Sequence, residues 1–152
     1  MLRKTLALLL IPLVTACSGK PPDDLGAKDG RLAPCGRAPN CVSSQAQDKK
    51  HYVPPLSFSA PVETSRRALL EILPKMPGTK IVAEDTLYLR AEFTSKTMKF
   101  VDDVEFLLDP LSNVIHVRSA SRLGYSDMGV NRKRVEEIRK RLGEALEPVT
   151  RG

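Results

Sequence analysis

Apolar and polar residues alternate along four runs in the second half of the chain. These runs cover residues 79–84, 86–94, 101–108 and 114–121. In the second run, the apolar positions are Leu87, Leu89, Ala91 and Phe93. Alternation with a period of two predicts strands with one buried face, and the short connections predict antiparallel hairpins. The pattern therefore predicts a four-stranded meander with one apolar face and one face in water.

A first stretch before this meander has the spacing of an amphipathic helix. We expect Ser59 to cap it, Pro61 to lie in its first turn and Pro74 to end it. Its apolar face consists of Val62, Ala68, Leu69, Ile72 and Leu73.

A second helix is expected to begin near Asp127, which is a good helix cap. Its apolar face consists of Val135, Ile138, Leu142 and Ala145, and this stripe extends back to Asn131 and Met128. Asn131 is therefore predicted to point inward, where its amide needs partners such as Ser119 and Ser121. Most of the basic residues that follow, at positions 132–134, are expected to face water.

These elements predict an α+β fold: an antiparallel four- to five-stranded meander sheet with two helices packed on one face. The stretch "VPPLSFSAP" predicts a short extended piece at the sheet edge, because Pro54 and Pro55 cannot donate hydrogen bonds to a neighbouring strand.

The N-terminal stretch "MLRKTLALLLIPLVTAC" has the pattern of a bacterial lipoprotein signal. Its last four residues fit the lipobox, in which a signal peptidase cuts before a cysteine whose thiol carries diacylglycerol. The apolar run is too short for a transmembrane anchor. We therefore predict a signal peptide at residues 1–16, lipidation of Cys17 and attachment to a membrane through fatty acyl groups such as palmitate. Because Ser18 follows in place of an Asp, the predicted location in a cell with an outer membrane is the periplasmic side of that membrane.

The rest of the chain is predicted to form one tether and one domain. Residues 17–33 contain Pro, Gly and alternating charges without an apolar period, which predicts a flexible tether. Residues 34–148 are predicted to form a single α+β domain, because a chain of 152 residues can bury one sizeable core.

Two cysteines, Cys35 and Cys41, lie close together in a turn rich in Gly and Pro. In an extracytoplasmic compartment such a pair most simply forms a disulfide, with a free thiol pair and a metal site as alternatives. A metal site would need more ligands, and the only histidines are His51 and His116. No metal and no cofactor are therefore predicted.

Composition narrows the classes of partner. The net charge of +6 is modest and Trp is absent, so the chain lacks the basic, aromatic surface of a nucleic-acid-binding protein. The predicted partners are a membrane, reached through the N-terminal lipid, and an envelope protein or small anionic ligand. The composition indicates no oligomeric state.

Three stretches resemble a known family: "PCGRAPNCVSSQA", "YLRAEFTSKTMKFVDDVEF" and "VIHVRSASRLGYSDMGVNRKRVEEIR". They are similar to the signature stretches of a bacterial and plastid family, the domain of unknown function numbered 1499. The resemblance covers nearly all of the predicted domain. The family brings no established activity, so it assigns no functional residue.

The polar face of the predicted sheet carries the first candidate site. Hairpin geometry predicts the cross-strand pairs Glu105–His116, Asp103–Arg118 and Arg90–Asp103, which place an acidic strand between basic neighbours. One interpretation is a solvated ladder of charges, and the other is a binding surface.

The stretch "SASRLGYSDMGVNRKR", residues 119–134, would extend this surface. Arg118 and Arg122 fall on the same side, and the turn brings Tyr125 and Asp127 to the end of the strand. Two guanidinium groups, hydroxyls and a helix N-terminus would suit a carboxylate or phosphate.

The alternative for this junction is purely structural. Asp127 would cap the helix, the arginines would pair with carboxylates, and residues 39–46 would lie across the face and use its hydrogen bonds. On the binding hypothesis, Asn131 and the serines form an inner layer, while Arg118, Arg122 and Tyr125 form an outer layer that meets a ligand.

Enzymatic motifs are absent from the sequence. There is no nucleophile elbow, zinc-protease motif, phosphate loop or dinucleotide fingerprint. Alternation places Ser119 and His116 on opposite faces, which argues against a catalytic triad. We therefore expect an envelope-anchored domain with an interaction or structural role. Binding of an anionic ligand or lipid headgroup is the alternative, and a hydrolase activity is less favoured than either.

Overall fold

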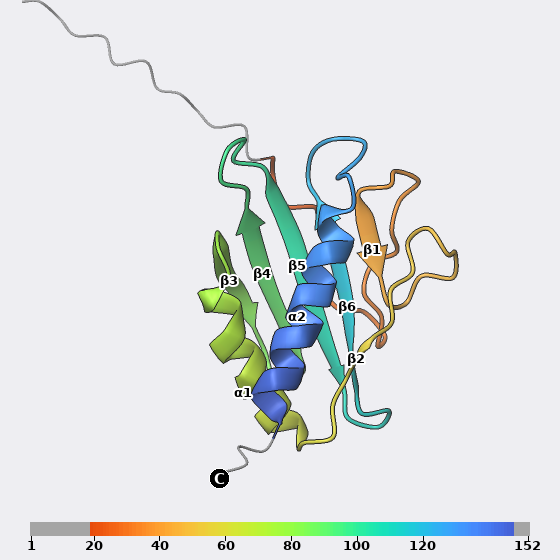
Figure 1. Cartoon of the computed structure of the whole chain (residues 1–152). Coiled ribbons are helices and arrows are strands. Elements are labelled where there is room, and N and C mark those ends of the chain that lie inside the picture. The colour runs from red at the N-terminus through yellow and green to blue at the C-terminus, as the bar shows by residue number, and fades with distance from the viewer. Residues whose placement is uncertain (1–18, 148–152) are drawn as a thin grey trace, which may run out of the picture.

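The computed structural model describes residues 19–147, which form one antiparallel sheet with both helices on one face (Figure 1). The strands in spatial order are β1 (Cys41–Ser43), β6 (Val114–Ser121), β5 (Val101–Asp109), β4 (Tyr88–Thr94) and β3 (Thr79–Glu84). A short strand, β2 (Leu56–Ser57), also pairs with β6. The α+β class and the placement of the helices are confirmed, although the sheet has six strands instead of four or five.

The predicted signal peptide and Cys17 lie outside the described residues. Within residues 19–147, neither helix is long and apolar enough to span a membrane.

The meander β3–β6 matches the four predicted runs, but its register differs from the predicted one by two residues. Glu105 lies opposite Arg118 instead of His116, and Asp103 lies opposite Ala120 instead of Arg118. Arg90 likewise lies opposite Glu105. A shift of two residues keeps every side chain on its predicted face, because the side-chain period of a strand is two.

The first strand, β1, was not predicted as a strand. It pairs with the outer edge of β6, where Cys41 lies opposite Ala120. Residues 39–46 therefore contribute an edge strand and do not lie across the polar face, contrary to the structural alternative considered above.

Helix α1 (Val62–Ile72) is followed by a short 3-10 helix (Leu73–Lys75). Pro61 occupies the N-cap position and no side chain caps the helix, so the predicted cap by Ser59 is wrong. The apolar face of the helix packs on the sheet as predicted, with Leu69 and Leu73 fully buried.

Helix α2 (Val130–Leu146) begins three residues later than predicted, after Gly129 in the left-handed conformation. Its buried face includes Val135, Ile138 and Leu142, as predicted. Ala145 is exposed and Leu146 packs against the core in its place, because a helical stripe advances by 3.6 residues. Met128 precedes the helix and is 88% exposed, so the stripe does not extend back to it.

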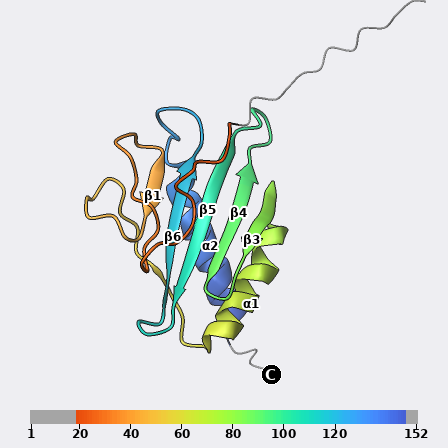
Figure 2. The same ribbon diagram turned by 180° about the vertical axis from the view of Figure 1, so that it is seen from behind.

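The segment predicted as a flexible tether lies against the polar face of the sheet, which we call the back face (Figure 2). The backbone N–H of Gly26 donates to Glu105 Oε1 at 2.8 Å, and that of Leu32 donates to Gln45 Oε1 at 2.8 Å. Leu32 is buried. These contacts correct the tether prediction for residues 19–33: backbone donors hold the segment in place, without an apolar stripe.

Candidate functional site

The back face carries a buried charge network, in which carboxylates from β4 and β5 meet guanidinium groups. Its members are Tyr88, Arg90, Glu92, Asp103, Glu105, Arg118 and Arg122. Five of the eight sequence-predicted binding residues belong to it: Arg90, Asp103, Glu105, Arg118 and Arg122.

Asp103 is 1% exposed and holds two arginines. Its carboxylate accepts from Arg90 Nη1 at 2.7 Å and from Arg122 Nε at 2.7 Å. Arg122 also pairs with Glu92 and donates to the carbonyl of Gly19 at 3.4 Å. The hydrogen bonds that Arg122 donates to Asp103 raise the pKa of Arg122 above its already high value, since burial opposes the charge less than the two carboxylates favour it.

Glu105 is fully buried and is held from three directions. It accepts from Arg118 Nη1 at 3.0 Å, from the Tyr88 hydroxyl at 2.8 Å and from the N–H of Gly26 at 2.8 Å. Burial, and then the negative charge of Glu105, raise the pKa of the Tyr88 phenol well above its usual value.

The network therefore does not form the predicted outer layer. The side chain of Arg122 is 5% exposed and that of Arg118 is also buried, and each has a carboxylate partner. The charges of these arginines are neutralised within the chain, and residues 19–33 cover the face. Within residues 19–147, each guanidinium of this network has a carboxylate partner, so none is left free for an anion from solution.

Three of the predicted binding residues lie away from the network: His116, Tyr125 and Asp127. His116 lies near the start of β6, where its Nδ1 is 3.3 Å from Ser44 Oγ and its Nε2 is 4.0 Å from Asp109 Oδ2. Tyr125 is 75% exposed in the loop between β6 and α2. The structure thus does not bring the eight candidate residues together in one site.

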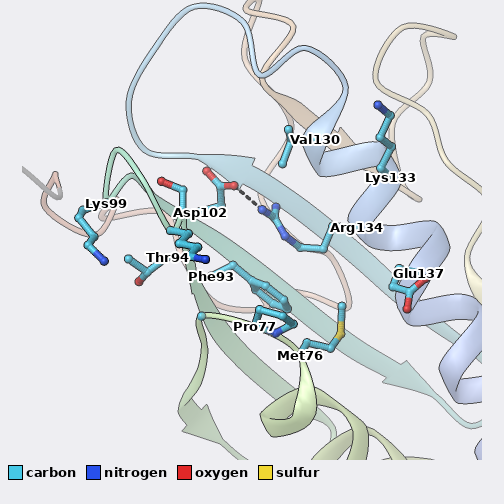
Figure 3. Close-up of a pocket in the computed structure, with 13 residues that line it drawn as sticks. Met76, Pro77, Phe93, Thr94, Lys99, Asp102, Val130, Lys133, Arg134 and Glu137 are labelled. Atoms are coloured by element: carbon cyan, nitrogen blue, oxygen red, sulfur yellow. Dashed lines mark hydrogen bonds and ion pairs between the residues drawn. The ribbon is translucent and has the colours of Figure 1, made fainter.

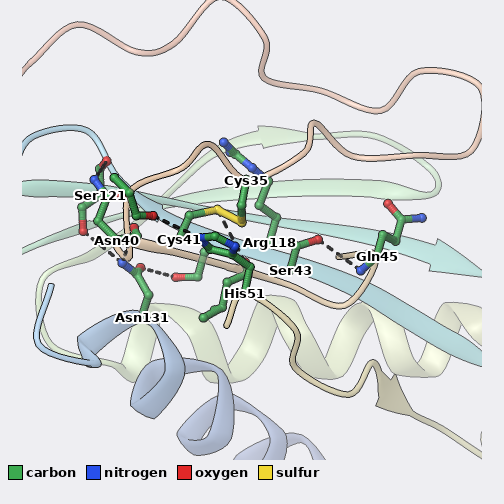
Figure 4. Close-up of a disulfide and its surroundings, with 12 residues drawn as sticks. Cys35, Asn40, Cys41, Ser43, Gln45, His51, Arg118, Ser121 and Asn131 are labelled. Atoms are coloured by element: carbon green, nitrogen blue, oxygen red, sulfur yellow. Dashed lines mark hydrogen bonds between the residues drawn. A yellow bond between two sulfur atoms is a disulfide. The ribbon is translucent and has the colours of Figure 1, made fainter. Parts of the chain in front are cut away.

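The predicted inner layer around Asn131 is present at the junction of β6 and α2 (Figure 4). Asn131 is fully buried, and its Oδ1 accepts from Ser119 Oγ at 2.6 Å. Its Nδ2 lies 2.9 Å from Ser121 Oγ and 3.0 Å from the carbonyl of Asn40. The amide therefore ties β6, α2 and the residue before β1 to one another.

Asp127 serves the start of α2, although it lies before the cap position. Its carboxylate accepts from the N–H groups of Gly129 and Asn131 at 2.9 and 2.8 Å. Burial acts to raise the pKa of Asp127, but these hydrogen bonds outweigh it and lower the pKa on balance. Its role is structural, as the alternative hypothesis stated.

The basic first turn of α2 is compensated by an acid on the sheet. Most of the basic residues at positions 132–134 were expected to face water, but the Nη2 of Arg134 donates to Asp102 Oδ2 at 2.5 Å. Its guanidinium carbon also lies 4.8 Å from the centre of the Phe93 ring, which adds a cation–π contact.

The predicted disulfide between Cys35 and Cys41 is confirmed (Figure 4). It joins the end of the segment covering the back face to strand β1. His51 is buried nearby. Its Nδ1 lies 2.9 Å from Asp48 Oδ1 and its Nε2 lies 3.1 Å from the carbonyl oxygen of Ala38, so it is a structural residue of this turn.

Sequence reasoning missed a pocket on the helix side of the sheet, with a volume of about 670 Å³. It lies between the N-terminal half of α2, the turn before β3 and the β4–β5 hairpin, and we call it the α2–hairpin pocket (Figure 3). Its apolar lining includes Met76, Pro77, Phe93 and Val130, and its basic lining includes Lys96, Lys99 and Lys133.

One wall of the pocket depends on a glycine. Gly78 has φ +72°, and a Cβ there would lie 2.2 Å from the carbonyl oxygen of Thr94. The Thr94 N–H also donates to the Gly78 carbonyl at 2.8 Å. Only glycine allows the turn to approach β4 this closely.

The charges in the pocket are unbalanced. Its two acids are occupied, because Asp102 pairs with Arg134 and Glu137 pairs with Arg141 at 2.6 Å. Within residues 19–147, none of the three lysines has a carboxylate within salt-bridge distance. Figure 3 shows Lys99 and Lys133 on opposite sides of Phe93. An apolar floor with free ammonium groups around it is suited to a ligand that has both an anionic and an apolar part.

Comparison with known proteins gives a family but no activity. No curated protein matches the chain. The profile of the family described as "Protein of unknown function (DUF1499)" matches residues 31–142, which include all strands and most of α2. The chain therefore belongs to the protein family of unknown function DUF1499.

Proposed function

We propose that this protein is a lipid-anchored domain of the cell envelope that binds an anionic amphiphile in the α2–hairpin pocket. The observation that carries the binding function is the set of three lysines without carboxylate partners around an apolar floor. The back face is a weaker candidate, because its arginines are neutralised by carboxylates and its surface is covered.

The anchoring part of the proposal rests on the sequence. The lipobox ending at Cys17 favours lipidation after removal of residues 1–16, and location on the extracytoplasmic side of a membrane. The Cys35–Cys41 disulfide supports this compartment, because disulfides persist in oxidising environments. Cys17→Ser should abolish labelling with radioactive palmitate and leave an unprocessed precursor. Unchanged labelling would contradict the anchor.

The binding part of the proposal is tested with short-chain lipids. The mature protein in phosphatidylcholine nanodiscs would be titrated calorimetrically with dihexanoyl phosphatidic acid and, separately, with dihexanoyl phosphatidylcholine. We expect tighter binding of the phosphatidic acid, because its phosphate carries the extra negative charge that the lysines attract.

Paired variants locate the site. Lys99→Ala and Lys133→Ala should each weaken binding about tenfold, since a hydrogen bond to a charged group contributes about 1.5–3 kcal/mol and about 1.4 kcal/mol is a factor of ten. Lys140→Ala is the matched control, because Lys140 lies on the exposed side of α2 and outside the pocket lining. Equal affinity for the two lipids, or equal loss in all three variants, would contradict the pocket as the binding site.

A further inference from the structure

Exposed apolar side chains gather in two loops of the structure. One loop is the β4–β5 connection, residues 95–100, and the other is the β6–α2 connection, residues 122–129. Their apolar side chains are between 39% and 88% exposed and belong to Met98, Phe100, Leu123, Tyr125 and Met128. Side chains of this size in contact with water are unusual when several of them lie together.

The two loops lie at the same end of the molecule, which we call the loop end. Strand β5 begins and strand β6 ends there, since Asp102 lies opposite Ser121. The N–H of Arg122 also donates to the carbonyl of Val101 at 3.1 Å. Figure 1 shows both loops at this end and the last turn of α2 at the opposite end.

The loop end is also basic. Lys96 and Lys99 belong to the first loop, and Lys133 lies in the first turn of α2, next to the second loop. The same three lysines line the α2–hairpin pocket. Apolar side chains interspersed with free lysines are the composition of a surface that contacts lipid headgroups and the upper part of the acyl chains.

The start of the described chain lies against this end. The carbonyl of Gly19 accepts from Arg122 Nη1 at 3.4 Å, and a Cβ on Gly19 would lie 3.3 Å from Leu123 Cγ. Cys17 is two residues earlier, so the chain allows at most about 7 Å between its Cα and that of Gly19. Acyl groups on Cys17 would therefore enter a bilayer directly beside Leu123.

We infer that the loop end docks onto the lipid bilayer, with its apolar side chains among the headgroups and its lysines on lipid phosphates. This inference rests on the proposed lipid anchor. The bilayer is the occupant that the geometry favours, because a lipid on Cys17 leaves no length of tether to hold the loop end away from it. The domain thus lies on the membrane, and the α2–hairpin pocket shares its lysines with the docking surface.

Single tryptophans test the docking, because the chain contains none of its own. Phe100→Trp and Met128→Trp place a probe in each loop, and Leu111→Trp is the control in the β5–β6 turn at the other end, where Leu111 is 95% exposed. Each full-length variant would be purified with its lipid and reconstituted into vesicles of phosphatidylethanolamine and phosphatidylglycerol containing brominated phosphatidylcholine.

The two loop probes should show blue-shifted emission and strong quenching by bromine, while the Leu111→Trp probe should emit as in water without quenching. Adding Lys99→Glu to the Phe100→Trp variant should reduce the quenching, whereas adding Lys140→Glu should not. Solvent-like emission from all three probes would overturn the docking. A blue shift without bromine quenching that grows with protein density would also overturn it, since another protein surface would then cover the loop end.

Intact mass of the same preparations separates this inference from the proposed function. A lipid mass on Cys17 together with unquenched loop probes rejects the docking and leaves the anchor standing. A mature chain without lipid rejects the anchor and, with it, the docking geometry. Binding of phosphatidic acid to the pocket is measured independently of either result.

Discussion

The back face and the α2–hairpin pocket both place basic side chains beside carboxylates, but they differ in how many of those charges are paired. On the back face, Asp103 and Glu105 hold arginines from the neighbouring strands, and residues 19–33 cover the arrangement. In the pocket, both acids are paired with arginines, while three lysines remain without acidic partners among the described residues.

This difference separates a structural use of charge from a use in binding. When a buried arginine is paired with a carboxylate, removing either group destabilises the fold, because the other charge is left buried without a partner. The paired arginine has no charge left for a ligand. A lysine without a partner contributes little to stability and keeps its charge for a partner from solution or from a membrane. The four predictions below test this contrast, from the largest expected effect to the smallest.

The largest effect is expected from Asp103→Ala. The substitution leaves Arg90 and Arg122 near one another in a largely buried site with only Glu92 as a carboxylate partner, so the free energy of unfolding should fall by about 3–5 kcal/mol. Chemical denaturation measures the change. Glu144→Ala, an exposed carboxylate on α2, is the control and should change stability by less than about 0.5 kcal/mol. Equal losses in both variants would mean that the back face is not a specific stabilising network.

An intermediate effect is expected from Asn131→Leu. The variant removes the amide that hydrogen-bonds to Ser119, Ser121 and the carbonyl of Asn40, so the free energy of unfolding should fall by about 1–3 kcal/mol. Thermal melts would show it. The calorimetric affinity for phosphatidic acid, measured below the melting temperature, should stay the same, because Asn131 does not line the pocket. A variant that keeps its stability but loses phosphatidic acid binding would contradict the separation of a structural region from a binding region.

A smaller effect concerns alkaline pH and Tyr88. Its phenol has a raised pKa in the folded chain, whereas in the unfolded chain the pKa is about 10. The stability that this proton contributes is therefore complete below about pH 10 and is lost as the pH rises from there toward the folded pKa. Melting temperatures from about pH 9 to about pH 11 should fall less steeply for Tyr88→Phe than for the unmodified protein. Tyr125→Phe, at an exposed position, should follow the unmodified protein, and an identical slope for all three would contradict the raised pKa of Tyr88.

The smallest effect on stability is expected from the pocket lysines. Lys99→Ala and Lys133→Ala should each change the free energy of unfolding by less than about 0.5 kcal/mol, because neither lysine has an acidic partner among residues 19–147. Denaturant titration in the absence of lipid is the measurement. A loss as large as that of Asp103→Ala would show that the lysines are structural and would remove the contrast between the two regions.

The sheet could be predicted from the sequence because the alternation in the meander is strong. The run at 114–121 coincides with β6, and the residues on each face of β4 and β5 were assigned correctly. The partners of Glu105 and Asp103 were not, because alternation with a period of two cannot distinguish registers that differ by two residues. The polar face was expected to lie in water, with its arginines either paired with carboxylates or open to a ligand, whereas the structure pairs and buries them.

The covering segment and the pocket could not be predicted for different reasons. Residues 19–33 lack an apolar period, and their contact with Glu105 is made by the N–H of Gly26, a group that every residue except proline carries. The pocket is assembled from three separate stretches, so no single motif marks it. A weak signal in the sequence is the basic first turn of α2, because cations at a helix N-terminus oppose the helix dipole.

The long sequence separation of the N-terminal contacts has a consequence for the order of folding. Gly26 is 79 residues from Glu105, and Asn40 is 91 residues from Asn131, whereas neighbouring strands of the meander are joined by short turns. Because closing a long loop costs more entropy than closing a short one, we expect the meander to form before β1 and residues 19–33 join it. The Cys35–Cys41 disulfide joins residues only six positions apart, so it can form before β1 pairs with the meander. Pulsed hydrogen exchange during refolding should then protect the amides of β5 before those of Gly26 and Leu32, so that the covering segment closes over a sheet that has already formed.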